Sequence, residues 1–250
     1  MNKEIIIDRG VIIQSLINKN NYNTYLEIGI KQKLCFDFIK IESKESLDIN
    51  KTYNPTYVNK SDDFFKSIDS QHKKWDIIFV DGDHEKNQVL KDINNSLKHL
   101  NEGGTIVCHD MCPPNYKDLF PDACYNSWEA LAYLRKNNPD LEIYVVDTDY
   151  GVGVIKKGKQ TLFKGEILDF NRKYSNPITD FNFLNKNKNE LLNLINLEEF
   201  ISKIGINLIP KTNIWTNFNV INKNHPQWGV VTVEIENQSN LIKTEGLFKI

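Results

Sequence analysis

The sequence lacks an excess of charge of either sign. Its 250 residues carry 31 lysines and arginines against 33 aspartates and glutamates, for a formal net charge of −2 at pH 7. No basic block stands out, so the charge predicts no broad attraction to nucleic acid. Hydrophobic residues make up 40% of the chain, which is enough for a core. The length allows one large domain or a domain with an appendage.

Long apolar runs and paired cysteines are also missing. No apolar run approaches the ~20 residues that a membrane-spanning helix needs, and Asp8 and Arg9 interrupt the apolar run where a signal peptide would need it. The cysteines stand at positions 35, 108, 112 and 124 without a CxxC pair. The last three could be drawn with His109 as a zinc site, but their spacing fits no common finger. We therefore expect reduced thiols in a cytoplasmic protein.

Short apolar runs alternate with segments of helical spacing. Strands are expected over residues 24–30, 45–49, 75–81 and 105–110, with a weak strand within 54–65, and helices over 32–40, 63–70, 85–100 and 126–139. This alternation predicts an α/β fold with a doubly wound, mostly parallel sheet. The last strands, 141–147 and 151–157, are joined by three residues. That is too short for a parallel crossover, so one strand near the end of the sheet should be antiparallel.

The pattern changes after about residue 160. Residues 187–205 keep an amphipathic spacing that predicts one helix, and two strands are expected over 213–221 and 228–236, around a turn. We therefore divide the chain into a ligand-binding domain, residues 1–160, and a C-terminal α+β extension, residues 161–250. The extension would pack on the domain as a lid, a support or an oligomer contact.

The glycine pattern of a dinucleotide-binding loop is absent. In an open α/β sheet, ligands bind beyond the carboxyl ends of the strands. Glu27 and Gly29 end the first strand, and Asp48 ends the second, at the offset typical of an acid that binds ribose hydroxyls. Lys31 and Lys33 stand where a pyrophosphate loop needs glycine. A dinucleotide is therefore disfavoured, and a nucleoside without phosphate remains open.

Polar side chains also end the next two strands. Asp81 and His84 follow one strand, and His109 and Asp110 follow the other. Successive strands are often neighbours, so their carboxylates could hold a cation such as Mg²⁺. The ordinary pKa of histidine, ~6.5, suits His84 as a general base, although a loop or helix-cap histidine is the alternative. Asp83 is better explained as the N-cap of the following helix.

Several motifs, in order, resemble those of class I SAM-dependent methyltransferases: YLEIGI, SLDI, KSDDFF and WDIIFVDGDHEKNQVLKDINNSLKHLNEGGTIVCHDM. The branch found with glycan biosynthesis genes is the most similar, since WEALAYLRKNNPDLEIYVVDTDYGVGVI and FNFLNKNKNELLNLINLEEF also fit its pattern. The resemblance covers about residues 20–205, and DGDH and DTDYGVGVI are its specific parts. Macrolide-sugar O-methyltransferases are more distantly similar, through an Asp with a His three residues later and an acidic pair ending the next strand.

The resemblance implies a Rossmann-like fold in which residues 1–160 bind SAM and transfer its methyl group to a hydroxyl of a sugar or glycan precursor. It places the cofactor beside Glu27, Gly29, Asp48, Ser61, Asp62 and Asp81. It also implies His84 as the general base and a divalent cation, Mg²⁺ or another, at Asp81, His109 and Asp110. His109 stands where the macrolide-sugar enzymes have Glu.

Two other functions stay open. One is a catechol-like, metal-dependent O-methyltransferase of a small aromatic molecule. The other is a binding module with this fold and no activity, which the lysines at positions 31 and 33 would suit. The expected partner is a small-molecule or glycan acceptor, with no nucleic acid and no membrane span, and a homo-oligomer is left open.

Overall fold

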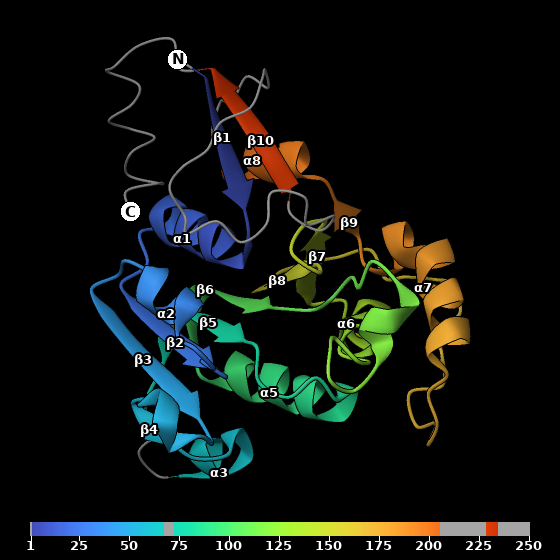
Figure 1. Cartoon of the computed structure of the whole chain (residues 1–250), viewed down its shortest axis with the longest axis horizontal. Coiled ribbons are helices and arrows are strands. Elements are labelled where there is room, and N and C mark those ends of the chain that lie inside the picture. The colour runs from blue at the N-terminus through green and yellow to red at the C-terminus, as the bar shows by residue number, and fades with distance from the viewer. Residues whose placement is uncertain (1, 68–72, 206–228, 235–250) are drawn as a thin grey trace.

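A twisted eight-stranded sheet forms the centre of the protein (Figure 1). The computed structural model describes residues 2–67, 73–205 and 229–234. The strand order is β4-β3-β2-β5-β6-β8-β7-β9, and β8 runs antiparallel to both of its neighbours while the other pairs are parallel. The strands are β2 (Thr24–Ile28), β3 (Ser43–Asp48), β4 (Tyr57–Val58), β5 (Trp75–Val80), β6 (Leu100–Cys108), β7 (Leu141–Val146), β8 (Val152–Lys157) and β9 (Leu194–Ile195). The predicted Rossmann-like sheet with one antiparallel strand near its end is confirmed.

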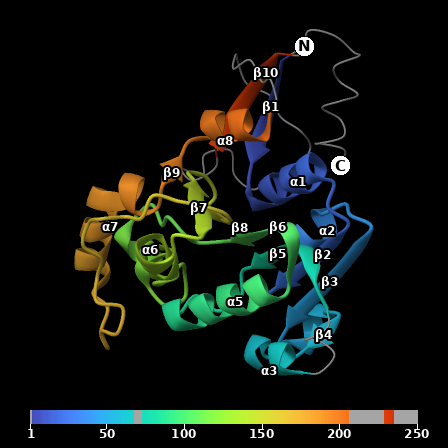
Figure 2. The ribbon, with the colours of Figure 1, turned by 180° about the vertical axis from the view of Figure 1, so that it is seen from behind.

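Helices cover both faces of this sheet (Figures 1 and 2). The helices and 3₁₀ turns are α1 (Arg9–Asn20), α2 (Leu34–Phe38), η1 (Lys51–Tyr53), α3 (Ser61–Lys66), α5 (Lys86–Lys98), η2 (Tyr116–Leu119), α6 (Trp128–Asn137), α7 (Pro177–Leu191) and α8 (Leu197–Ile204). One hydrophobic core joins α3, α5, α6 and α7 to the sheet, and a second joins α1 and α8 to its other face. Along β5, Ile78 and Val80 belong to the first core and Ile77 and Phe79 to the second. This alternation explains why the strand reads as one continuous apolar run.

Two predicted boundaries are wrong. Residues 101–104 do not end a helix, because β6 already begins at Leu100, opposite Trp75 of β5. The single helix expected over 187–205 is instead α7, the short strand β9 and α8. Asn193 adopts a left-handed backbone (φ 49°), and Asn196 caps α8 in a capping box with Glu199. These asparagines interrupt the helical pattern that the apolar residues alone suggest.

The predicted capping role of Asp83 is wrong, and α3 and α6 begin without a side-chain cap. Glu85, not Asp83, caps α5, while Asp83 accepts a hydrogen bond from the amide of Glu85 (2.9 Å). α3 begins earlier than expected, after Lys60, with no side-chain cap. Ser127 precedes α6 without a capping bond, and Asn126 instead accepts from the amide of Lys86 (2.7 Å). Tertiary contacts thus take up side chains that local sequence assigns to caps.

The two ends of the described chain meet in a separate two-stranded ribbon. Strand β1 (Asn2–Ile7) pairs antiparallel with β10 (Gly229–Glu234), which lies within the predicted strand 228–236. The other expected strand, 213–221, lies outside the described residues. β9 adds to the main sheet beside β7, so part of the predicted extension completes that sheet. Within the described parts of the chain, no helix is long and apolar enough to cross a membrane.

Candidate active site

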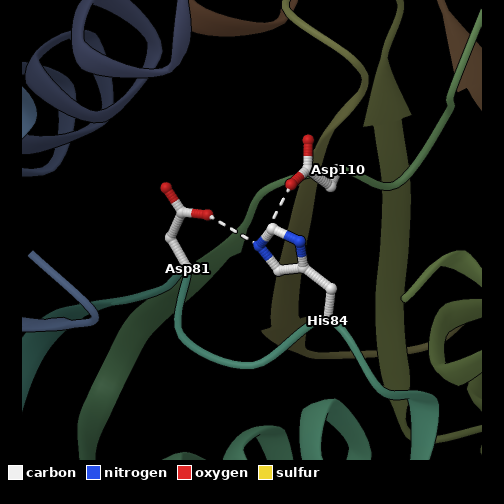
Figure 3. A group of neighbouring side chains, drawn as sticks. All are labelled: Asp81, His84 and Asp110. Carbon is white, nitrogen blue, oxygen red and sulfur yellow. Dashed lines mark ion pairs between the residues drawn. The ribbon is translucent and has the colours of Figure 1, made fainter. Parts of the chain in front are cut away.

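The ends of β5 and β6 bring two acids and two histidines together. The strands are parallel neighbours in which Val80 lies opposite Cys108, so the residues that follow leave the sheet at the same edge. Asp81, His84 and Asp110 each offer a ligand atom within 4.8 Å of the others (Figure 3). The structure therefore brings the two predicted strand-end clusters into one site.

His84 has one ring nitrogen fixed and the other directed at the acids. Its Nδ1 donates to the carbonyl of Ala123, because a carbonyl can only accept. Its Nε2 lies 3.2 Å from Oδ2 of Asp110 and 3.7 Å from Oδ1 of Asp81 (Figure 3). Burial opposes the charged ring, but the bond to Asp81 and the charge of Asp110 outweigh it and raise the pKa of His84 to about 9. Nε2 is therefore the nitrogen that can exchange a proton with a ligand.

His109 lies on the other side of the two acids. Its Nδ1 is 3.4 Å from Oδ1 of Asp81 and 3.2 Å from Oδ1 of Asp110, and its Nε2 is 3.4 Å from Oδ1 of Asp149. Burial opposes the charge of the ring, but these carboxylates outweigh it and raise the pKa of His109 well above its ordinary value. Nη1 of Arg9 also lies 3.1 Å from Nε2 of His109, so both ring nitrogens of His109 already have partners. His109 as a metal ligand stays a prediction, and the donor group within 4.8 Å contains His84 in its place.

The two carboxylates fit a divalent cation by their chemistry. Although burial opposes their charge, the neighbouring histidines hold the pKa of Asp81 and of Asp110 below the ordinary value, so both are ionised. Asp110 has a left-handed backbone (φ 64°), and Oγ of Ser127 donates to its carbonyl at 2.6 Å. The thiol of Cys124 donates to its Oδ1 at 3.2 Å. Oxygen ligands of this kind suit Mg²⁺, and an added imidazole suits a transition metal.

Gly29, which follows β2, packs against Asp81. It therefore lies between the acidic cluster and the part of the sheet edge that is predicted to bind the cofactor. Its φ is 83°, and a Cβ there would lie 2.2 Å from the carbonyl oxygen of Asp81, so only glycine fits. Glu27 is only 2% exposed and accepts a hydrogen bond from the hydroxyl of Tyr25. Its carboxyl therefore lies beneath the edge of the sheet, and its contact with a cofactor stays a prediction.

Asp48 organises the turn that follows β2. Its Oδ2 accepts from the amides of Ile30 (3.0 Å) and Lys31 (3.2 Å). Lys31 and Lys33 have φ of 40° and 63°, the left-handed conformation that glycine adopts without strain. The turn thus keeps a glycine-like backbone with lysines in place, at a cost of about 1–2 kcal/mol each.

Ser61 and Asp62 stand at the start of α3, beside α5. Nε2 of Gln88 donates to both, at 3.1 Å to Oγ of Ser61 and 3.2 Å to Oδ1 of Asp62. Nζ of Lys91 lies 3.2 Å from Oδ2 of Asp62. They follow β4, on the same side of β2 as Asp48, and their position beside an adenine ring stays a prediction.

Residues 19–111 match the family model of a methyltransferase domain. The match agrees with the predicted methyltransferase resemblance over this segment. The matched span holds every residue that the sequence assigned to the site, from Glu27 to Asp110. The comparison with curated proteins found no match.

Several solved structures whose names call them methyltransferases resemble the chain, at low identity. The O-methyltransferase TomG from Streptomyces achromogenes, in complex with SAM, is 13% identical with a TM-score of 0.48, over 60% of this chain and 79% of that one. An O-methyltransferase from Bacillus cereus in complex with SAH is 15% identical with a TM-score of 0.45, over 60% and 80%. MycE, from the mycinamycin biosynthetic pathway, in complex with Mg, SAH and mycinamycin VI, is 16% identical with a TM-score of 0.39, over 61% and 49%.

Sequence reasoning missed two residues that lie against the methyltransferase domain's acidic cluster. Asp149, in the turn between β7 and β8, and Arg9, at the start of α1, both contact His109. The DTDYG segment carries a signal for Asp149, since a glycine after two polar residues marks a tight turn. Arg9 shows no pattern of its own, because its partners lie about 100 and 140 residues away.

Proposed function

We propose that the protein transfers a methyl group from SAM to a hydroxyl of a sugar or glycan precursor, with His84 as the general base. The supporting observation is the position of Nε2 of His84 beside two carboxylates, at the sheet edge of a methyltransferase domain. Methyl transfer to oxygen needs an aligned acceptor and a group that takes its proton.

His84 is suited to that proton transfer by its fixed tautomer. The carbonyl of Ala123 keeps the proton on Nδ1, which leaves Nε2 to accept one from the acceptor hydroxyl. With a pKa of about 9, the ring is mostly protonated at neutral pH in the absence of other charges. The base therefore needs something that offsets the charge of Asp81 and Asp110.

A divalent cation held by these two carboxylates would supply that offset. Asp81 and Asp110 would hold it, and its charge would offset the two carboxylates that raise the pKa of His84 and would acidify an acceptor hydroxyl bound beside it. The donor group within 4.8 Å supports this assignment. His84 then acts as base rather than as a third ligand, a distinction that the tests below address.

The cofactor would lie at the same edge of the sheet, beyond the ends of β2, β3 and β4. We assign the ribose hydroxyls to Asp48, the methionine end to the region of Glu27 and Gly29, and the adenine to the region of Ser61 and Asp62. The methyltransferase domain match, which spans all of these residues, supports the assignment.

A sugar acceptor is supported by aromatic side chains on the loop that contacts His84. The loop that returns to His84 through Ala123 also carries Tyr116 and Phe120, which are 41% and 45% exposed. Exposed aromatic faces of this kind can stack against the apolar faces of sugar rings. The same surface could take a phenol, so a panel of glycans and catechols separates the two acceptor classes.

SAM binding is tested first, by calorimetry and by thermal shift. No heat and no shift at millimolar SAM, with an intact fold, would refute the proposal and favour a binding module. The base is tested with His84→Gln, which is expected to lower kcat by at least ~100-fold and leave the Kd for SAM unchanged. His99→Gln is the matched control, because Nδ1 of His99 also bonds a carbonyl, that of Lys73 (2.9 Å), at the opposite end of the strands.

Unchanged turnover in His84→Gln would remove His84 as base. Chelation tests the cation. EDTA is expected to abolish turnover while SAM binding persists, and added Mg²⁺ or Mn²⁺ is expected to restore it. Full activity after chelation would reject the cation. If His84 is a ligand and not the base, His84→Gln weakens Mn²⁺ binding, and excess Mn²⁺ restores its turnover.

A further inference from the structure

The turn between β7 and β8 and the start of α1 meet at the acidic cluster. We propose that Arg9 and Asp149 are positioning residues of the active site. Together they hold the ring of His109, which in turn holds the carboxylates that face His84. The inference rests on the proposed function, since it gives both residues a part in the same methyl transfer.

Asp149 contacts both Arg9 and His109. Its carboxylate accepts from the amide of Arg9 (3.0 Å) and from Nη1 of the same residue (2.9 and 3.1 Å). Its Oδ1 is also 3.4 Å from Nε2 of His109. Nη1 of Arg9 also lies 3.1 Å from that Nε2, so the guanidinium, the carboxylate and the imidazole all contact one another. Arg9 and Asp149 together fix the position of the His109 ring.

A continuous path of short contacts runs from this pair to the proposed base. Nδ1 of His109 lies 3.2 Å from Oδ1 of Asp110, and Oδ2 of the same carboxylate lies 3.2 Å from Nε2 of His84. One carboxylate thus bridges the two imidazoles, so a rotation of His109 turns the group that faces the base. Nε of Arg9 adds a direct contact of 3.8 Å to Oδ2 of Asp81.

The turn that carries Asp149 is a tight hairpin turn packed against the segment after Asp110. The amide of Gly151 donates to the carbonyl of Thr148 at 2.8 Å, and the central residues Asp149 and Tyr150 have φ of 47° and 61°, the positive values that such turns favour. A Cβ at Gly151 would lie 2.2 Å from the amide nitrogen of Cys112, and that amide donates to the carbonyl of Tyr150 at 2.7 Å. The turn therefore holds Asp149 at a fixed position beside the acidic cluster.

Hydrogen bonds hold the N-terminal segment against this turn. Oγ1 of Thr148 donates to the carbonyl of Ile7 at 2.5 Å, two residues before Arg9. The amide and the guanidinium of Arg9 then both bind Asp149. Both positioning residues lie outside residues 19–111, so they add to the matched methyltransferase domain a support for its acids.

The test is Asp149→Asn, with Asp180→Asn as the matched control. Asp180 is also a buried carboxylate that binds an arginine, Arg172 (2.9 Å), and a backbone amide, that of Asn176 (3.1 Å), but it contacts no residue of the site. Asp149→Asn is expected to lower kcat by about 10- to 100-fold with the KM for SAM nearly unchanged. Asp180→Asn is expected to affect stability only.

Imidazole resonances give a readout that does not depend on turnover. The chain has five histidines, and substitution assigns their signals in protein labelled at histidine. In metal-free protein, Asp149→Asn is expected to move the signals of both His109 and His84 and to leave that of His99 in place. Asp180→Asn is expected to move none of them.

Arg9→Lys provides a second variant if Asp149→Asn does not fold. It keeps the charge but loses the forked contact, so its effect on kcat and on the His84 signal is expected to be smaller than that of Arg9→Gln. An unmoved His84 signal in folded Asp149→Asn or Arg9→Gln overturns the proposal, as does an equal loss of kcat in Asp180→Asn. If the wild type neither binds SAM nor turns over, the proposed function fails, while the resonances still decide the coupling.

Discussion

Replacing Glu27 by Gln should make the protein more stable at alkaline pH. Burial, with the added charge of Asp81, raises the pKa of the Glu27 carboxyl from 4.5 to about 8, although the hydroxyl of Tyr25 opposes the shift. The folded state therefore keeps a proton that the unfolded chain releases. Stability from this group is highest below pH 4.5 and falls as the pH rises towards 8.

The size of this loss of stability follows from the pKa shift of Glu27. Each pKa unit corresponds to about 1.4 kcal/mol, so a shift from 4.5 to about 8 sets an upper limit of about 5 kcal/mol on the loss. Gln does not titrate, and its amide oxygen can still accept from Tyr25. The free energy of unfolding of Glu27→Gln is thus expected to differ least from the wild type at pH 5 and to exceed it increasingly up to pH 8.

Urea unfolding at pH 5, 6, 7, 8 and 9 measures this difference. Glu45→Gln, on the neighbouring strand, is the control with the opposite sign. Although burial opposes it, Lys73, Tyr57 and Trp75 bond the Glu45 carboxylate and lower its pKa. That variant is expected to be less stable than the wild type above pH 5, with the difference shrinking in acid. A constant difference between Glu27→Gln and the wild type from pH 5 to pH 8 would refute the raised pKa.

Two further pairs of variants test the packing. Gly29→Ala is expected to destabilise the fold by more than ~2 kcal/mol in urea unfolding, because its Cβ would meet backbone atoms. Gly103→Ala is expected to cost about 1 kcal/mol, because Gly103 has a positive φ but open space around it. Equal losses of stability in the two variants would contradict this reasoning. Glu129→Gln removes the carboxylate that the buried Lys86 and the nearby Arg172 share. It is expected to lower Tm more than Lys86→Met, because Lys86→Met leaves the ion pair of Glu129 with Arg172 intact. A larger loss of Tm in Lys86→Met would contradict the view that Glu129 is the shared partner.

The mostly parallel sheet and its one antiparallel strand could be predicted because the strands that form them are marked by local sequence features. The apolar run of β5 and the three-residue link before β8 are local features, and each has one structural consequence. The helix boundaries were harder, since Asn193 and Asn196 break a pattern that the apolar residues continue. Neither asparagine is a strong enough local signal to outweigh the periodicity.

The residues of the candidate site also fall into two groups, those that the sequence could predict and those that it could not. Asp81, His84 and Asp110 follow strands that lie side by side, so the general rule for parallel sheets brought them together. Arg9 and Asp149 reach the site from distant segments of the chain, and no local pattern links them. The burial of Glu27 could not be predicted for another reason. Its carboxyl group accepts a hydrogen bond from the hydroxyl of Tyr25, and the sequence of a strand end does not show whether a side chain there is buried.

The ribbon of β1 and β10 sets an order of assembly during synthesis. About 220 residues of chain separate the two strands, which at ribosomal speed is roughly 10 to 45 s. All eight strands of the main sheet end by Ile195, so they can be synthesised while the first strand is still unpaired. Arg9 follows that strand directly and binds Asp149, so its contacts with the sheet can form before the ribbon closes.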